Sequence, residues 1–297
     1  MTVMTREDVE FRTVDGLTLR GWLYPSGKRG PALVMTQGFN ASKEYLLADV
    51  AVWFQKRGVT SLLVDIRTTG LSDGEPRNDI DLDKQVEDCH DAVSFLSRHP
   101  SVDPEMIVYW GYSLGAVISL CAAALDKRAA AVIATAPNTD FIFDPVKRAA
   151  TLSLAMRDRV SRLAGNPPLY LKIIGEDGQN PAGWYLGEER RSPEELDALF
   201  NSSNIMNQVT IQSYYRLLRW QPFGLMPSVS PTPVMVVTPS DDDLSKPENQ
   251  RKLFDIFQEP KEFVLAENKG HMNCISGVDG EQFLQKQLEF MKRMLKF

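Results

Sequence analysis

The sequence predicts an α/β fold in which a mostly parallel sheet is covered by helices on both faces. Short apolar runs suited to buried strands alternate with longer stretches of helical periodicity, and units of that kind build parallel sheets. The chain has 297 residues, of which 43% are hydrophobic. That length and composition are sufficient for a large core on both sides of one sheet.

The chain opens with a predicted β-hairpin. Residues 11–14 and 17–24 have strand-like composition and flank Asp15-Gly16, a pair that readily adopts the positive φ angles of a tight turn. Six later runs are apolar on both faces, as a parallel sheet covered by helices requires. These predicted strands are residues 32–36, 61–65, 106–110, 131–135, 234–238 and 263–265. Helical periodicity predicts helices at residues 45–57, 81–98, 114–126 and 281–297.

The alternation of strands and helices breaks between residues 139 and 229. Only two helices are predicted in this stretch, at residues 192–200 and 209–218. An insertion of this length with its own helices is expected to form a cap or lid. The sequence therefore predicts a core made of residues 1–138 and 230–297, with a helical cap made of residues 139–229.

Composition and charge exclude several classes of function. The formal net charge of −6 argues against nucleic acid as a partner, because such sites need clustered Lys and Arg. No apolar stretch is long enough for a membrane helix, and no signal peptide is visible. The three cysteines have no paired or zinc-like spacing, so we expect free thiols, a cytoplasmic location and no metal.

A candidate nucleophile lies at a predicted junction between a strand and a helix. Gly111-Tyr112-Ser113-Leu114-Gly115 matches the G-x-S-x-G pattern of a nucleophile elbow. An apolar strand runs directly into this segment and an apolar helix leaves it, which argues against a chance match in an ordinary turn. The two glycines remove side chains that would collide in so sharp a bend. Ser113 is therefore the predicted nucleophile.

A serine hydroxyl needs a neighbouring base, and the chain contains three histidines. His90 falls inside a predicted helix among charged residues, where a solvated position is expected. His99 precedes a proline in a predicted loop. His271 follows the last predicted strand, where the chain order Ser, Asp, His of such enzymes places the base. His271 is therefore the predicted base.

The acid that orients this base is expected after the strand at residues 234–238. Three adjacent aspartates follow that strand, Asp241, Asp242 and Asp243, and spacing alone does not separate them. Asp243 fits a D-x-x-x-P arrangement in which the proline opens the next helix. We therefore prefer Asp243, with Asp242 next, and keep Asp140 after the preceding strand as a further candidate.

The elbow and the downstream histidine resemble those of the α/β-hydrolase fold, and other stretches resemble one branch of it. Gly38-Phe39-Asn40-Ala41-Ser42-Lys43-Glu44 is similar to a GF-x-A-x-KE loop, and residues 65–76 are similar to a D-x-R-x-x-G-x-SDGEP segment. Shorter matches lie at residues 207–210, 231–235 and 259–261. The branch that these stretches resemble is the fungal polyketide transferase and thiohydrolase family, found with secondary-metabolite synthases.

This resemblance implies cleavage or transfer of an acyl group without a metal or organic cofactor. The implied substrate is an ester or thioester of a polyketide-type or other hydrophobic metabolite, free or bound to a carrier protein. The intermediate would be an acyl-enzyme on Ser113. Transfer to an alcohol acceptor, hydrolysis of a carbon–carbon bond and a non-catalytic ligand-binding role are the competing functions. The sequence leaves the oligomeric state open, a homodimer included, and we expect Asp65 and Arg67 to brace loops.

Two backbone N–H groups must hold the oxygen that becomes negative during acyl transfer. One is expected from Leu114, directly after the nucleophile. By analogy with the family, the other is expected from Phe39, in the loop after the strand at residues 32–36. Many relatives have His-Gly where this chain has Gln37-Gly38, but the donor is a backbone group, so Gln37 need not impair it.

The predicted cap is rich in aromatic residues, and an apolar substrate cavity is one explanation for them. Packing of the cap onto the sheet is the competing explanation. The expected substrate-binding residues are Gln37, Tyr112, Trp184, Tyr214 and Tyr215.

Overall fold

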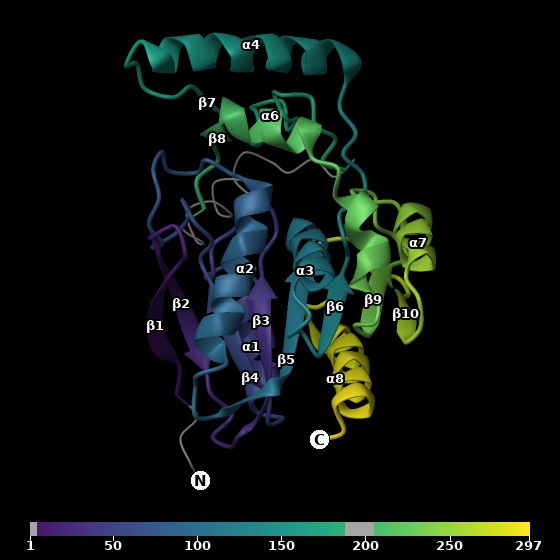
Figure 1. The fold of residues 1–297 in the computed structure, drawn as a ribbon. Coiled ribbons are helices and arrows are strands. Elements are labelled where there is room, and N and C mark those ends of the chain that lie inside the picture. The colour runs from purple at the N-terminus through teal and green to yellow at the C-terminus, as the bar shows by residue number, and fades with distance from the viewer. Residues whose placement is uncertain (1–4, 188–204) are drawn as a thin grey trace.

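The computed structural model describes residues 5–187 and 205–297, and within them one sheet of eight strands forms the centre of the molecule (Figure 1). The strand order is β1-β2-β4-β3-β5-β6-β9-β10. The first two pairings, β1 with β2 and β2 with β4, are antiparallel, and all later pairings are parallel. The strands are β1 (Glu7–Arg12), β2 (Thr18–Tyr24), β3 (Gly30–Thr36), β4 (Thr60–Val64), β5 (Val102–Tyr112), β6 (Ala131–Thr135), β9 (Val234–Pro239) and β10 (Lys261–Ala266).

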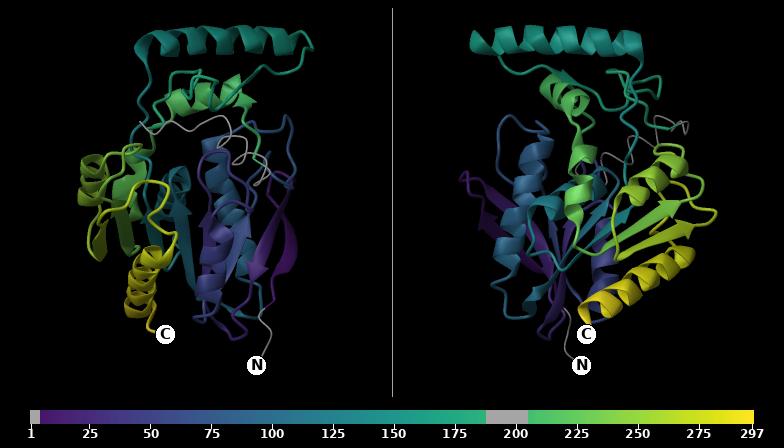
Figure 2. Two further views of the ribbon diagram at one scale, coloured as in Figure 1. Left: turned by 180° about the vertical axis from the view of Figure 1, so that it is seen from behind. Right: turned by 45° about the vertical axis from the view of Figure 1, so that its right-hand side comes forward.

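Helices cover both faces of the sheet, which confirms the predicted fold class. One apolar cluster contains residues of α2 and α3, and a second contains residues of α1 and α8. Figures 1 and 2 show these two helix pairs on opposite faces. The core helices are α1 (Leu47–Gln55), α2 (Leu82–Leu96), α3 (Leu114–Leu125), α7 (Pro247–Ile256) and α8 (Glu281–Leu295), with 3-10 turns η1 (Pro222–Val229) and η2 (Val278–Gly280).

The segment between β6 and β9 lies over one end of the sheet. It contains α4 (Pro145–Leu163), a short pair of strands β7 (Tyr170–Leu171) and β8 (Val209–Thr210), and α6 (Ile211–Arg219). Helix α6 lies between the sheet and α4, which forms the top of the molecule in Figure 1. Helix α6 matches the helix predicted at residues 209–218, whereas the one predicted at residues 192–200 lies outside the described residues.

Helix α4 was not predicted, and its burial pattern explains why. Of its nineteen residues only Thr151, Ala155 and Asp158 are buried. The fully buried positions are thus two polar residues and an alanine, so α4 offers no apolar stripe that packs onto the core, although apolar residues do recur at helical spacing on its exposed face.

All three cysteines are buried, and they are free, as expected from their spacing. Burial raises the pKa of the Cys89, Cys121 and Cys274 thiols to about 12. None of the helices in residues 5–187 and 205–297 combines the length and the hydropathy of a membrane span. Within the same residues, no group of three or more His, Cys, Asp or Glu side chains could hold a metal ion.

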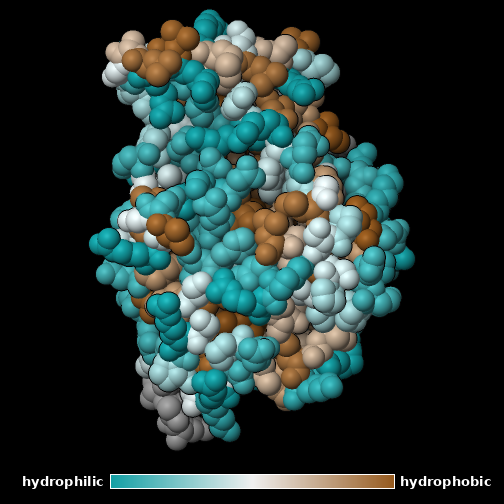
Figure 3. Space-filling view, in the orientation of Figure 1, coloured by the Kyte–Doolittle hydropathy of each residue, from teal (hydrophilic) through white to brown (hydrophobic). Residues whose placement is uncertain are grey.

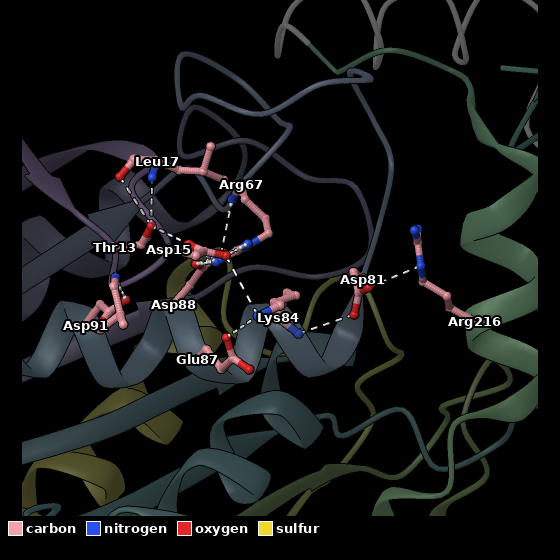
Figure 4. Close-up of polar contacts among 11 residues, drawn as sticks. Thr13, Asp15, Leu17, Arg67, Asp81, Lys84, Glu87, Asp88, Asp91 and Arg216 are labelled. Atoms are coloured by element: carbon pink, nitrogen blue, oxygen red, sulfur yellow. Dashed lines mark hydrogen bonds and ion pairs between the residues drawn. The ribbon is translucent and has the colours of Figure 1, made fainter. Parts of the chain in front are cut away.

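An ion cluster with a buried Arg67–Asp88 pair and an exposed Asp15 joins the first hairpin to the sheet and to α2 (Figure 4). The Arg67 guanidinium donates to Asp88 of α2 at 2.6 Å and to Asp15 of the hairpin turn at 2.7 Å. Burial raises the pKa of Asp88, while the hydrogen bond from Arg67 holds the pKa of Asp15 well below its usual range. One side chain thus braces three segments, as expected for Arg67.

A second group of ion pairs ties α6 to the segment that leads into α2. Arg216 of α6 contacts Asp79 at 2.9 Å and Asp81, the N-cap of α2, at 3.1 Å. Figure 4 shows Arg216 reaching from α6 to Asp81 across the gap between the two helices. Trp220 adds a hydrogen bond to Asp83 at 3.1 Å. These contacts fix α6 relative to the sheet.

The Arg67 cluster leads to a first prediction. Arg67→Ala leaves Asp88 buried without its cation, so we expect the free energy of unfolding in urea to fall by about 3–5 kcal/mol. Arg219→Ala is the control, because Arg219 and Asp83 form an exposed pair at 3.7 Å and its loss should cost less than about 1 kcal/mol. Equal losses in the two variants would show that the buried cluster does not brace the fold. Adding Asp88→Ala to Arg67→Ala should restore part of the lost stability.

Candidate active site

Ser113 occupies a sharp turn between β5 and α3. Its φ of 58° and ψ of −125° lie in a region that non-glycine residues rarely adopt, which is the strain expected of a nucleophile elbow. The turn holds because Ser113 donates its N–H to the carbonyl of Thr135 at 3.0 Å, while its own carbonyl accepts from Ala116 and Asn138. These bonds fix the serine backbone between β6 and α3.

The glycines beside Ser113 are required by close backbone packing. A Cβ on Gly111 would lie 2.2 Å from the carbonyl oxygen of Gly115. A Cβ on Gly115 would lie 2.2 Å from the carbonyl oxygen of Gln37. Since both obstacles are backbone atoms, no side-chain adjustment could relieve them. The same packing brings the loop after β3 against the serine turn.

His271 lies in the loop after β10 and reaches Ser113 directly. Its Nε2 is 2.8 Å from the Ser113 Oγ, and its Nδ1 is 2.8 Å from the Oδ2 of Asp242. The side chains of His271 and Asp242 are almost fully buried, whereas Ser113 is half-buried and open to a cavity. Serine, histidine and aspartate thus form one continuous line of hydrogen bonds.

The preference for Asp243 as the acid is corrected by this geometry, because Asp242 is the aspartate that contacts His271. The Asp242 carboxylate points into the protein, where it accepts from the N–H groups of Leu244 and Ser245 and from the side chain of Gln250. Asp241 and Asp243 are exposed and line the mouth of the cavity. The D-x-x-x-P pattern marks the start of α7 at Pro247 but not which aspartate faces inward.

The remaining candidates for the acid and the base make their contacts away from the serine. Asp140 accepts from the N–H of Lys246 and from the side chain of Asn249, at the start of α7. His90 of α2 contacts a carbonyl of α3, and His99 lies in the turn after α2. None of these three side chains is hydrogen-bonded to the serine or to the histidine beside it.

Tyr112, the residue before the serine, supports the histidine loop. Its phenol donates to the carbonyl oxygen of His271 in a very short contact, and its ring lies 5.8 Å from the imidazole. Burial raises the pKa of Tyr112 well above its ordinary value, so the hydroxyl remains a donor at neutral pH. Two hydrogen bonds therefore join the elbow to His271, one from the Tyr112 hydroxyl to the His271 backbone and one between Ser113 Oγ and the imidazole.

The two expected oxyanion donors lie on either side of the serine. Leu114 begins α3, and Phe39 follows Gly38, where an added Cβ would lie 3.4 Å from the Ser113 Cβ. Neither the N–H of Leu114 nor that of Phe39 donates a hydrogen bond to any of the described residues. Two backbone donors at a helix start and a facing loop form an arrangement suited to an oxyanion.

A buried ion pair anchors the loop that carries Phe39. Lys43 at the end of this loop donates both its backbone N–H and its ammonium group to Asp65, directly after β4. Asp65 also accepts from the N–H of Leu71, and both charged side chains are almost fully buried. As expected from the sequence, Asp65 braces a loop.

A cavity of about 550 Å³ opens above Ser113. Gln37, Tyr112 and Trp184 line it, as expected. Tyr214 and Tyr215 do not, which corrects the prediction for both. Tyr214 is fully buried with its hydroxyl bonded to Lys172 and Asn180, and Tyr215 packs against the core. The apolar residues that line the cavity include Phe39, Ala41, Ile173, Ile174, Leu186, Leu244 and Met272.

Chemically, this arrangement suits acyl transfer. A serine hydroxyl is hydrogen-bonded to an imidazole and the imidazole to a buried carboxylate. Two backbone donors beside the serine have no hydrogen-bond partner in the part of the chain that the structure describes. The apolar cavity would exclude water from a bound acyl chain.

Comparisons with known proteins agree with this description. A family model described as serine aminopeptidase, S33, matches residues 28–274. The chain is 98% identical to the polyketide transferase ATR5 of Stachybotrys chlorohalonatus, over the whole of both proteins. It is 44% identical to a thiohydrolase of Eupenicillium brefeldianum, over 97% of this chain and 94% of that protein.

Solved structures give the same relationship. The α/β-hydrolase GrgF from Penicillium sp. sh18 is 45% identical, with a TM-score of 0.91 over 99% of this chain and all of that one. DcsB, in complex with a substrate analogue, is 37% identical and also has a TM-score of 0.91, over 97% of this chain and 99% of that one. The chain therefore belongs to the α/β-hydrolase family of the S33 serine aminopeptidase type, and its relatives include fungal polyketide transferases and thiohydrolases.

Proposed function

We propose that the protein is a serine acyl hydrolase or acyltransferase that opens a thioester or ester of a polyketide-type acyl chain. The observation that carries this proposal is the unbroken contact from Asp242 through His271 to Ser113, at 2.8 Å for each step, at the base of an apolar cavity. The names of the relatives, polyketide transferase and thiohydrolase, support the substrate class.

The first half of the proposed reaction forms an acyl-enzyme. As the Ser113 Oγ bonds to the carbonyl carbon, the His271 Nε2 takes the hydroxyl proton and Asp242 stabilises the resulting imidazolium. The N–H groups of Phe39 and Leu114 hold the carbonyl oxygen while it is negative. The bond to the leaving thiol or alcohol then breaks, and that group leaves with the proton from His271.

The second half releases the acyl group from the serine. Water or an acceptor alcohol gives its proton to His271 and attacks the acyl carbon, and Ser113 recovers its proton as the ester bond breaks. Hydrolysis and transfer differ only in this second nucleophile. Gln37, Trp184 and Leu186 line the cavity in which the second nucleophile must reach the acyl carbon. The competition between water and alcohol is therefore expected to depend on how well the occupied cavity excludes water.

The assignment of the acid gives a second prediction. Asp242→Asn should lower kcat by about 10⁴, because the amide cannot hold the imidazole in the same tautomer or stabilise its charged form. Asp243→Asn is the matched control and should retain kcat within a few-fold, since Asp243 is exposed at the cavity mouth. A p-nitrophenyl hexanoate assay measures both, and circular dichroism checks that both variants fold. A large loss in Asp243→Asn with little in Asp242→Asn would reverse the assignment.

The acyl-enzyme gives a third prediction. After brief incubation with hexanoyl-N-acetylcysteamine, mass spectrometry of the intact protein should detect a hexanoyl adduct on Ser113. Adding a primary alcohol should divert product from hexanoic acid to the hexanoyl ester, because both nucleophiles compete for one intermediate. Ser113→Ala should give neither adduct nor product. Turnover that persisted in Ser113→Ala would remove the serine from the mechanism.

A further inference from the structure

The outward face of α4 carries an apolar stripe that faces solvent. Its members follow one another at alternating spacings of three and four residues, which places them along one side of a helix. Val146, Val160 and Leu163 have 79%, 69% and 89% of their surface exposed. Figure 3 shows hydrophobic residues along this top edge of the molecule. The stripe consists of Val146, Ala149, Ser153, Met156, Val160 and Leu163.

Such spacing is typical of a seam that packs against another helix. The large residues of the face stand on both sides of the small residues Ala149 and Ser153, so the face offers both knobs and a hole. Exposed apolar residues that gather along one face, here interrupted by Ser153, mark interaction sites in many soluble proteins. The fully buried positions of α4, which rests on α6, are by contrast Thr151, Ala155 and Asp158, and Leu154 packs beside them.

Basic side chains flank this seam. Helix α4 carries five basic residues and one acidic residue, although the chain as a whole has a net charge of −6. The one acid, Asp158, is buried and accepts from Leu169 and Gln212. Arg157 and Arg159 are exposed beside the seam and form no ion pair within residues 5–187 and 205–297. The face is therefore apolar along its centre and positive along its edges.

Helix α4 is also bonded directly to a wall of the active-site cavity. Thr151 donates to the carbonyl of Ala182, and the N–H of Asp144, the N-cap of α4, donates to the carbonyl of Gly183. The next residue, Trp184, lines the cavity and packs edge-on against Phe39 at 5.0 Å between ring centroids. A partner seated on α4 would thus be held beside the site of chemistry.

We propose that the outward face of α4 docks an acidic helix on the protein that delivers the acyl thioester. This inference rests on the proposed function, since it names the partner of the same site. Apolar contacts would fill the seam, and acidic residues would pair with Arg157 and Arg159, which would speed and orient the encounter. The class of partner is an acidic, helical carrier domain that bears its acyl group on a phosphopantetheine thiol.

The charges and side-chain sizes favour this occupant over two others. A second copy of α4 would bring arginines against arginines, which costs free energy when like charges meet at an interface. A membrane surface would accept the positive edges, but helices that lie in membranes present Trp, Phe or Leu to the lipid. Here the centre of the face includes Ala149 and Ser153, which fit the side chains of a facing helix better.

The experiment compares one acyl group in two forms, hexanoyl-phosphopantetheinyl carrier domain from a fungal polyketide synthase and hexanoyl-N-acetylcysteamine. For the double variant Arg157→Glu/Arg159→Glu, kcat/KM on the carrier domain should fall at least about tenfold, through KM, while kcat/KM on the small thioester stays within about twofold. The control is Lys286→Glu/Lys292→Glu, an equal change of charge at exposed positions on α8, at the other end of the molecule. It should leave both values unchanged.

A binding measurement keeps docking separate from chemistry. Fluorescence anisotropy of a labelled, unacylated carrier domain should show binding to Ser113→Ala that weakens with added salt and is lost in Arg157→Glu/Arg159→Glu. Binding of the carrier domain without turnover of either thioester would contradict the proposed function but support the docking face. Turnover of both substrates with no effect of the α4 variant on either measurement would overturn the docking face. The wild-type protein is also tested for binding to phosphatidylserine vesicles and for self-association. If the α4 substitutions abolish either of these while binding of the carrier domain persists, the proposal is likewise overturned.

Discussion

The site depends on how closely the backbone of the β3 loop approaches the turn between β5 and α3. Gly111 and Gly115 each lie against carbonyl oxygens, so any side chain at either position would push the serine turn away from its neighbours. That contact holds Ser113 at a positive φ and places its hydroxyl at the cavity floor. It also brings the loop that carries Phe39 against the turn that leads into Leu114. One steric constraint thus positions both the proposed nucleophile and the proposed oxyanion donors.

Buried charges then fix the loops that this contact brings together. Lys43 and Asp65 tie the oxyanion loop to the end of β4, and Asp242 is held by several hydrogen bonds before it orients His271. A buried carboxylate destabilises the fold unless each of its oxygens has donors, so these aspartates have little freedom to move. The result is a site whose geometry exists before substrate binds, as electrostatic stabilisation of an oxyanion requires.

Local sequence predicted those parts of the molecule that depend on local constraints. The strand, elbow and helix around Ser113 follow from glycine spacing and apolar runs, and the place of His271 follows from chain order. The sequence could not separate Asp242 from Asp243, because contacts made only in the folded protein decide which of the two faces inward. Those contacts are the hydrogen bonds of Asp242 to Gln250 and to the His271 imidazole. The prediction that Tyr214 lines the cavity was wrong for a similar reason. An aromatic residue in an aromatic-rich segment suggests a cavity wall, but the Tyr214 hydroxyl is hydrogen-bonded to Asn180 and to the carbonyl of Lys172.

Helix α4 shows a second limit of sequence-based prediction, which concerns the direction that a helix face points. Periodicity in a sequence shows that a helix has an apolar stripe, but the usual inference that the stripe faces the core is an added assumption. In α4 that assumption fails, because the core-facing positions are Thr151, Ala155 and Asp158 while the apolar seam faces solvent. A helix that turns its hydrophobic residues outward gains little stability from burying them, and the proposed docking of a partner would supply that burial. The arginines along the seam narrow that partner to an acidic one, and the hydrogen bonds to the cavity wall explain why it would bind there.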